Sequence, residues 1–306
     1  MVYDLIVVGA GPAGLTAALY ARRANKTVLL LEKDNFGGQI TYSPKVENYP
    51  GFAQISGSEL ADHMVEQVLG QGVEVELCCV TGIKEENGRK VVTTEEGSYE
   101  ATAVILATGA RHRMLGLPQE ERFVGQGISF CAVCDGAFYQ GKHVGMVGGG
   151  NSALQEALLL SDLAAHVTVI QNLHDFTGEE RLARQLRERG NVTILMDTVV
   201  SALHGGEQLQ RVTLRSLTDN RETELELDGL FVAIGLLPQN DPFQHVIALD
   251  EYGYANSTED CMTRTRGVFV AGDCRKKQVR QLTTAVGDGA VAALAACTYI
   301  DKQRNA

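Results

Sequence analysis

The sequence predicts an α/β protein made of two dinucleotide-binding, Rossmann-like domains, and three observations support this. An apolar strand, a glycine-rich turn, a helix and a second apolar strand follow one another twice, from Leu5 and again from Lys142. A later apolar run, Gly267–Ala271, ends in Gly-Asp. The chain has 306 residues, enough for two ordinary domains. We therefore expect parallel sheets with ligands at the carboxyl ends of their strands.

The first copy of this pattern predicts a nucleotide site. Leu5–Val8 is a short continuous apolar run, as expected for a strand buried on both faces. The glycine-rich turn that follows lets backbone N–H groups approach a pyrophosphate at the start of the helix Leu15–Arg23. Glu32 ends the second strand, 23 residues after Gly9, where a carboxylate can accept from a ribose hydroxyl. The predicted nucleotide-binding residues are Gly9, Gly11, Pro12, Ala13, Gly14 and Glu32.

The second copy differs at the corresponding acid. Gln171 lies 23 residues after Gly148, so an amide stands where the first copy has a carboxylate. An NADH site favours an acid here, and an NADPH site favours arginines just beyond it. The next arginine is Arg181, and the acids before it would repel a phosphate: Asp175, Glu179 and Glu180. This copy therefore resembles a nicotinamide domain without its nucleotide recognition. The alternative is that Gln171 hydrogen-bonds the ribose and NADH binds weakly.

The segment Cys131-Ala132-Val133-Cys134-Asp135-Gly136 carries the predicted redox chemistry. Two cysteines three apart can close and reopen a small disulfide, which stores two electrons. Asp135 supplies an acid or base beside the sulfurs. The alternative is half of a zinc site, but a structural zinc needs four ligands. The other five cysteines form no second pair at this spacing, so we favour redox chemistry and expect no metal: Cys78, Cys79, Cys261, Cys274 and Cys297.

Composition restricts the partners and the compartment. The net charge of −11 disfavours nucleic acid as a partner. The first apolar run is too short to span a bilayer and follows no basic segment, so we expect neither a membrane nor a secretory signal. Seven cysteines, an odd number, are typical of a reducing cytoplasm.

Several polar or glycine-containing loops follow apolar strands and are candidate ligand contacts, although each alone is ordinary turn chemistry. Asp273 could hold a ribityl hydroxyl or a phosphate-bound water, or could simply cap a turn. Arg280-Gln281-Leu282 precedes an alanine-rich helix expected from Thr283 to Ile300. The remaining loop candidates are Gly38, Gln39, Asn48, Ala107, Thr108, Gly109 and Gly272.

Taken together, these motifs resemble the low-molecular-weight thioredoxin reductase family over nearly the whole chain. The resemblance implies the three-layer β/β/α fold of FAD/NAD(P)-binding proteins. It also implies a discontinuous FAD domain, 1–115 and 245–306, around a domain, 116–244, that carries the disulfide. FAD would be held by the candidates above together with Val80. Thioredoxin is the implied substrate, and a homodimer the implied assembly. Cys134 would face the flavin, Cys131 would attack the partner disulfide, and Asp135 would move the proton.

The missing arginines make the chain most similar to the flavin-dependent ferredoxin–thioredoxin reductases, which implies ferredoxin as the electron donor. A basic cluster within residues 264–280 could steer such an acidic protein. An NADPH-dependent thioredoxin reductase with atypical recognition is the alternative. A ferredoxin–NADP reductase of similar fold would have no use for the two cysteines, and a flavin-binding redox sensor is the non-catalytic alternative. We expect Gly116 and residues 235–239 to act as hinges between the domains.

Overall fold

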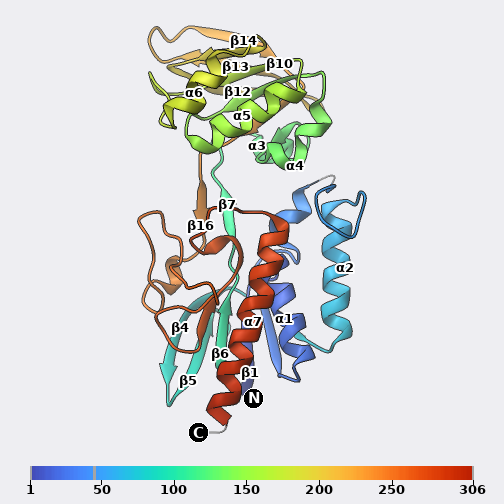
Figure 1. The fold of residues 1–306 in the computed structure, drawn as a ribbon, viewed down its shortest axis with the longest axis vertical. Helices are drawn as coiled ribbons and strands as arrows, with labels where there is room; N and C mark the ends of the chain where they lie inside the picture. Colours follow the sequence, from blue (N-terminus) through green and yellow to red (C-terminus); the bar gives the residue numbers. More distant parts are fainter. Residues whose placement is uncertain (1, 44–45, 305–306) are drawn as a thin grey trace. The chain divides into compact units, whose positions relative to one another are not determined.

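The computed structural model describes residues 2–43 and 46–304 and divides into two compact units (Figure 1). The first unit comprises Met1–Arg111 and Leu237–Ala306, and the second comprises His112–Leu236. The sequence placed these borders at 115/116 and 244/245. The chain instead crosses between the units at two short paired strands, β7 (Ala110–His112) and β16 (Leu236–Pro238). Residues 237–244 therefore fold with the first unit.

A seven-stranded sheet with the order β3-β2-β1-β6-β5-β4 organises the first unit, and β17 also pairs with β6. β1, β2, β3 and β17 run parallel to their neighbours, whereas β4, β5 and β6 form antiparallel pairs. The chain thus returns from the second unit to lay β17 beside β6. The strands are β1 (Val2–Val8), β2 (Val28–Glu32), β3 (Glu74–Leu77), β4 (Val80–Glu86), β5 (Arg89–Thr94), β6 (Ser98–Leu106) and β17 (Val268–Val270).

Alternate residues of the central strand β1 face two different cores. Leu5 and Val7 pack with the small residues of the helices, whereas Ile6 and Val8 pack with the opposite layer. Helices α1 and α7 can lie close together because Gly289, at their contact, has no side chain. A Cβ there would lie 2.2 Å from the Ala13 carbonyl oxygen. Figure 1 shows α7 lying along α1. The helices of this unit are α1 (Pro12–Arg23), α2 (Gly57–Gly70) and α7 (Leu282–Arg304), with 3-10 turns η1 (Gly38–Tyr42), η3 (Asp241–Phe243) and η4 (Gly272–Cys274).

Within the described residues, α7 is the one helix long and apolar enough to cross a membrane by length and composition. Its alanine face is buried against α1 in the core of the first unit, as Ala292, Ala293 and Ala296 are fully buried. Such a face is the signature of a core helix, and the helix extends beyond both ends of the predicted range.

The second unit repeats the first, as the sequence predicts. A parallel sheet of order β11-β10-β9-β15-β8 carries the helices, and a three-stranded antiparallel sheet follows it. The parallel strands are β8 (Ile128–Ser129), β9 (His143–Val147), β10 (His166–Ile170), β11 (Val192–Leu195) and β15 (Gly229–Val232). The antiparallel strands are β12 (Thr198–Gly205), β13 (Leu209–Ser216) and β14 (Glu222–Glu226). The helices are α3 (Glu120–Phe123), α4 (Ala132–Asp135), α5 (Asn151–Leu163) and α6 (Glu180–Arg187), with the 3-10 turn η2 (Gly136–Tyr139). The two-domain α/β prediction is confirmed.

Gly116, one of the two predicted hinges, lies inside the second unit and not at its border. The buried carboxylate of Glu120 accepts the backbone N–H groups of Leu115, Gly116 and Leu117 at 2.8, 2.8 and 3.2 Å. Three charge-assisted bonds hold this segment in place. These bonds join the segment to Glu120, and the role of Gly116 as a hinge stays a prediction.

Candidate functional site

Cys131 and Cys134 form a disulfide at the short helix α4. Cys131 caps the helix, and its Sγ accepts the backbone N–H of Cys134 at 3.2 Å. Val133, between the two cysteines, is 59% exposed. The structure therefore presents the bond on an accessible turn, where a sulfur can be attacked from solution.

Asp135 is anchored beside the disulfide by Ser129. The Ser129 hydroxyl donates to Oδ2 of Asp135 at 2.6 Å and accepts the backbone N–H of Cys131 at 3.2 Å. Oδ1 of Asp135 is buried and has no hydrogen-bond partner among the described residues. Burial raises the pKa of this carboxyl, and the Ser129 bond opposes that rise in part. Asp135 is thus a partly unsatisfied acid one residue from Cys134, suited to accept or donate a proton.

A second acid, Glu156 of α5, reaches the same turn, and sequence reasoning missed it. Its Oε2 accepts the backbone N–H of Ala132 at 3.1 Å. Burial raises the pKa of Glu156 to about 7, the Ala132 N–H opposes this, and Asp135 adds to it. A lone glutamate inside an amphipathic helix gives no sequence signal, because only the tertiary fold brings it to α4.

The glycine-rich turn of the first unit leaves no room for side chains. Gly9 has φ of +102°, and a Cβ there would lie 2.4 Å from the Ala107 carbonyl oxygen. A Cβ on Gly14 would lie 1.8 Å from the Gly9 carbonyl oxygen, and one on Gly38 would lie 3.3 Å from Gly11 Cα. Pro12 starts α1, and Ala13 is buried behind the turn. The ends of β1 and β6 and the turn before η1 therefore converge as bare backbone, a surface that suits a pyrophosphate.

Glu32 closes one side of this turn at the end of β2. Its Oε2 accepts the Ala10 N–H at 2.7 Å, and its Oε1 accepts the N–H groups of Lys33 and Asp34 at 2.9 and 2.8 Å. The residue is only 8% exposed. The carboxylate is fixed at the position that the sequence assigned to a ribose contact. Val80, the first residue of β4, is 8% exposed.

The Gly272–Asp273 turn brings the last part of the chain to the same end of the sheet. Gly272 has φ of +78°, and a Cβ there would lie 2.8 Å from the Ala13 Cβ. Asp288 of α7 accepts the Gly272 N–H at 3.1 Å. Oδ1 of Asp273 is buried without a hydrogen bond from the described residues, although Lys277 Nζ forms an ion pair with it at 3.1 Å. Besides this ion pair, the Asp273 carboxylate can still accept a hydrogen bond from a ligand hydroxyl.

The remaining candidates border this turn. The Arg280 guanidinium stacks 4.0 Å from the centre of the Tyr254 ring. The Gln281 side-chain oxygen accepts from Asn48 Nδ2 at 3.4 Å, which joins two segments far apart in sequence. Leu282 packs against a small cluster of Val46, Ile55 and Leu60. Gln39 is exposed in η1, and Thr108 and Gly109 are half-buried after β6.

Asn240 is a second residue that sequence reasoning missed. It is fully buried, and its Nδ2 donates to the carbonyl oxygens of Cys274 and Gly253 at 2.8 and 2.9 Å. Its Oδ1 accepts from Thr108 Oγ1 at 3.2 Å. One amide thus ties the end of β6 to the turn that carries Asp273. Cys274 is fully buried, and burial raises its pKa, which keeps the thiol protonated.

The predicted basic cluster is partly neutralised, and its members are Arg264, Arg266, Arg275, Lys276, Lys277 and Arg280. Arg275 and Lys277 are mostly buried and both pair with Asp288, at 2.8 and 3.1 Å. Three members stay exposed: Arg264, Arg266 and Lys276. An acid from α7 thus pairs with two of the cluster's charges, and its role as a docking site for ferredoxin stays a prediction.

In the second unit, Gln171 turns away from solvent. It is 3% exposed, and its Nε2 donates to the Asp175 carbonyl oxygen at 3.1 Å. The amide fills the space over Gly149, where a Cβ would lie 2.3 Å from Nε2. The acids that follow stay exposed. This turn therefore offers neither a carboxylate for a ribose nor a cation for a 2′-phosphate.

Comparison with known proteins agrees with this geometry. Residues 3–289 match the family model for pyridine nucleotide-disulphide oxidoreductases. The chain is 42% identical over 298 residues, 97% of each chain, to the "34.2 kDa protein in rubredoxin operon" of Clostridium pasteurianum. It is 38% identical to the thioredoxin reductase of Bacillus subtilis (strain 168), over 98% of this chain and 96% of the relative.

Among solved structures, the thioredoxin reductase from Streptococcus pyogenes MGAS5005 superimposes with a TM-score of 0.94 at 37% identity, covering 98% of this chain and 99% of that one. The convergent glycines and the fixed Glu32 fit the FAD that such proteins bind. The chain belongs to the low-molecular-weight thioredoxin reductase family, FAD-binding members of the pyridine nucleotide-disulphide oxidoreductases.

Proposed function

We propose that this protein reduces thioredoxin through the Cys131–Cys134 disulfide. The observation that carries the proposal is this disulfide on a turn with an exposed Val133, flanked by two half-buried carboxyls, in a chain 38% identical to a thioredoxin reductase. FAD, when bound, supplies the electron pair that opens the disulfide. The five other described cysteines are unpaired, which suits a reducing compartment, and we place the protein in the cytoplasm.

The exchange chemistry follows from the two thiols. Two electrons and two protons convert the disulfide into the thiols of Cys131 and Cys134. The Cys131 thiolate then attacks one sulfur of the thioredoxin disulfide, forming a mixed disulfide and releasing the other thioredoxin sulfur as a thiolate. The Cys134 thiolate attacks Cys131 Sγ, which restores the internal disulfide and releases the second thioredoxin sulfur.

We assign proton transfer in these steps to Asp135. Its Oδ1 is buried without a partner from the described residues, and burial favours its protonated form. A protonated Asp135 can give its proton to a departing thiolate and take it back from a thiol. Ser129 holds the other oxygen, which fixes the direction in which Oδ1 points.

The cofactor contacts are assigned residue by residue within the first unit. The turn residues Gly9, Gly11, Pro12, Ala13 and Gly14 take the pyrophosphate, and Glu32 takes the adenosine ribose. Asp273 takes a ribityl hydroxyl or a phosphate-bound water. The other contacts come from Gly38, Gln39, Asn48, Val80, Ala107, Thr108, Gly109, Gly272, Arg280, Gln281 and Leu282.

Ferredoxin is the proposed electron donor. The Gln171 amide turns inward, and the acids within residues 175–180 are exposed. The chain therefore lacks, at this turn, the acid at position 171 that contacts a ribose and the arginines that contact a 2′-phosphate. His174 in this loop pairs with Asp197 at 2.9 Å and so offers no free cation. The relative from Clostridium pasteurianum is named only for its operon, so its name assigns no nucleotide.

NADPH is the second candidate donor, because the matching family model is that of pyridine nucleotide-disulphide oxidoreductases. To distinguish the donors, the oxidised holoprotein is mixed anaerobically with NADPH, NADH or reduced ferredoxin, and bleaching of the flavin band is followed. Rapid bleaching by ferredoxin alone supports the proposal. Efficient thioredoxin turnover with micromolar NADPH would exclude it. A flavoprotein that bleaches but never reduces thioredoxin would be a redox sensor.

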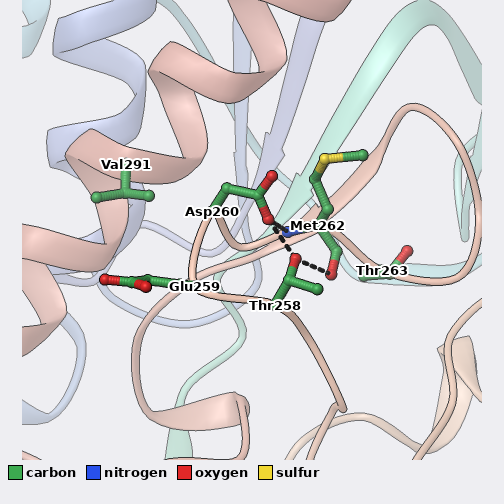
Figure 2. A pocket seen from close by; sticks show the side chains of 6 residues that line it. All are labelled: Thr258, Glu259, Asp260, Met262, Thr263 and Val291. Carbon is green, nitrogen blue, oxygen red and sulfur yellow. Dashed lines mark hydrogen bonds between the residues drawn. The ribbon is translucent and has the colours of Figure 1, made fainter.

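We also propose a homodimer. In the described residues, α7 exposes Val291 and Leu294, which are 40% and 55% exposed and lie on one helix face. Figure 2 shows Val291 on one side of a pocket and Met262, which is 38% exposed, on the loop across from it. Burying such apolar side chains favours association. Light scattering should give twice the chain mass, and Leu294→Glu should give a monomer; a parent that is monomeric at micromolar concentration would refute the dimer.

A further inference from the structure

Two half-buried acids approach the disulfide turn, and the proposed proton transfer uses only Asp135. Glu156 comes from a different element, α5, and bonds a different part of the turn. Its Oε2 accepts the Ala132 N–H at 3.1 Å, the first amide after Cys131. Glu156 therefore contacts the first residue of α4, Ala132, and Asp135 is the last residue of the same short helix.

We propose that Glu156 is a positioning residue for the dithiol: its bond to the Ala132 N–H holds the turn, and its charge governs how readily Cys131 becomes a thiolate. The proposal rests on the exchange role proposed for Cys131. Its test uses a phosphine as the reductant and needs neither thioredoxin, ferredoxin nor a nicotinamide nucleotide, so the proposal and the proposed function can fail separately.

Two negative charges, on Glu156 and on the Cys131 thiolate, would repel each other more strongly in this half-buried turn than in water. When the disulfide opens, the proton of Cys131 must leave for a thiolate to form, and an ionised Glu156 one residue away opposes the new negative charge. Burial raises the pKa of Glu156 to about 7, so this carboxyl can stay protonated near neutral pH. A neutral Glu156 does not repel the thiolate. The two groups then titrate as a coupled pair.

The other groups near this pair are few and mostly acidic. Asp135 of α4 is the charged residue that acts on Glu156. Tyr139 of η2 interacts electrostatically with Asp135 and with Asp228, which precedes β15. Burial raises the pKa of Tyr139 to about 12. Lys142 Nζ lies over the Tyr139 ring, 5.5 Å from its centre. Glu156 is therefore the group placed to change charge near neutral pH at the Ala132 end of the turn.

Glu156→Gln separates charge from hydrogen bonding, because the amide oxygen can still accept the Ala132 N–H. Glu156→Ala removes both. Asp162→Asn is the matched control, since Asp162 is an acid of the same helix whose side chain is 56% exposed. Each holoprotein is reduced with a phosphine and alkylated with iodoacetamide from pH 5.5 to 9.5. Peptide mass analysis then gives the alkylation rate of Cys131 alone.

We expect Glu156→Gln to lower the midpoint of the Cys131 rate profile by about 1 pH unit and to remove an inflection near neutral pH. Asp162→Asn should match the parent. Hydrogen exchange of the 131–136 peptide should be unchanged in Glu156→Gln and faster in Glu156→Ala. A Glu156→Gln profile that superimposes on the parent would refute the charge role. Equal, unchanged exchange in both variants would refute the positioning role.

Discussion

Asn240→Ala should destabilise the first unit, although Asn240 belongs to none of the recognisable motifs. The side chain is fully buried and makes three hydrogen bonds, to Thr108, Gly253 and Cys274. Alanine would remove the Asn240 bonds to two carbonyl oxygens and a hydroxyl, although the Cys274 oxygen would keep the Ala255 N–H at 2.9 Å. At about 1 kcal/mol for each bond, the free energy of unfolding should fall by about 3 kcal/mol. For a unit of this size, that lowers the melting temperature by roughly 6–12 °C.

The assay is thermal unfolding of the holoprotein, followed by the rise in flavin fluorescence as FAD is released. FAD should leave at a lower temperature because Asn240 ties the Thr108 end of β6 to the turn of Asp273. Gln239→Ala is the control, since its side-chain bonds are exposed and 3.3 to 3.4 Å long, and should change stability by less than about 0.5 kcal/mol. Equal melting of the two variants would refute the reasoning.

Three further predictions concern the cofactor and the buried acid. Gly9→Ala should yield protein that is insoluble or depleted of FAD, because its Cβ would lie 2.4 Å from the Ala107 carbonyl oxygen. Gly70→Ala is the control, because a Cβ there meets nothing within 4 Å. The flavin-to-protein absorbance ratio measures the FAD content. Heat-released cofactor should have the mass of FAD, and recovery of FMN would contradict the ribose assignment to Glu32. Glu156 binds its proton more tightly in the folded state, so its contribution to stability falls as pH rises from 4.5 through about 7. Between pH 5 and pH 8, the free energy of unfolding of Glu156→Gln, measured in urea, should therefore rise relative to that of the parent by at most about 3 kcal/mol.

The fold was predictable because its signals are local. Buried parallel strands read as continuous apolar runs, and glycine-rich turns join them to helices, so both copies of the pattern are visible in the sequence. The close backbone approach at Gly9 and Gly14 explains why the turn must be glycine. The unit borders were less predictable, because β7 and β16 are three-residue strands that gain their identity only by pairing with each other.

The disulfide was predictable because residue type and spacing coincide at Cys131 and Cys134. The site was not predictable where one side chain acts through a distant contact. Glu156, Asn240 and Asp288 are each single polar residues, and only folding brings them to the disulfide turn, to Thr108 and to Gly272. The same reason explains the basic cluster: its charges are adjacent in sequence, but the acid that neutralises Arg275 and Lys277 comes from α7.

The central claim is that electrons leave this protein for thioredoxin through Cys131 and Cys134. The most direct measurement is a single-turnover experiment, in which chemically reduced holoprotein is mixed with oxidised thioredoxin without any donor. The parent should convert about one thioredoxin disulfide to a dithiol for each electron pair that it holds. Cys131→Ser and Cys134→Ser should each keep their FAD and convert none. Full conversion by Cys134→Ser would contradict the account.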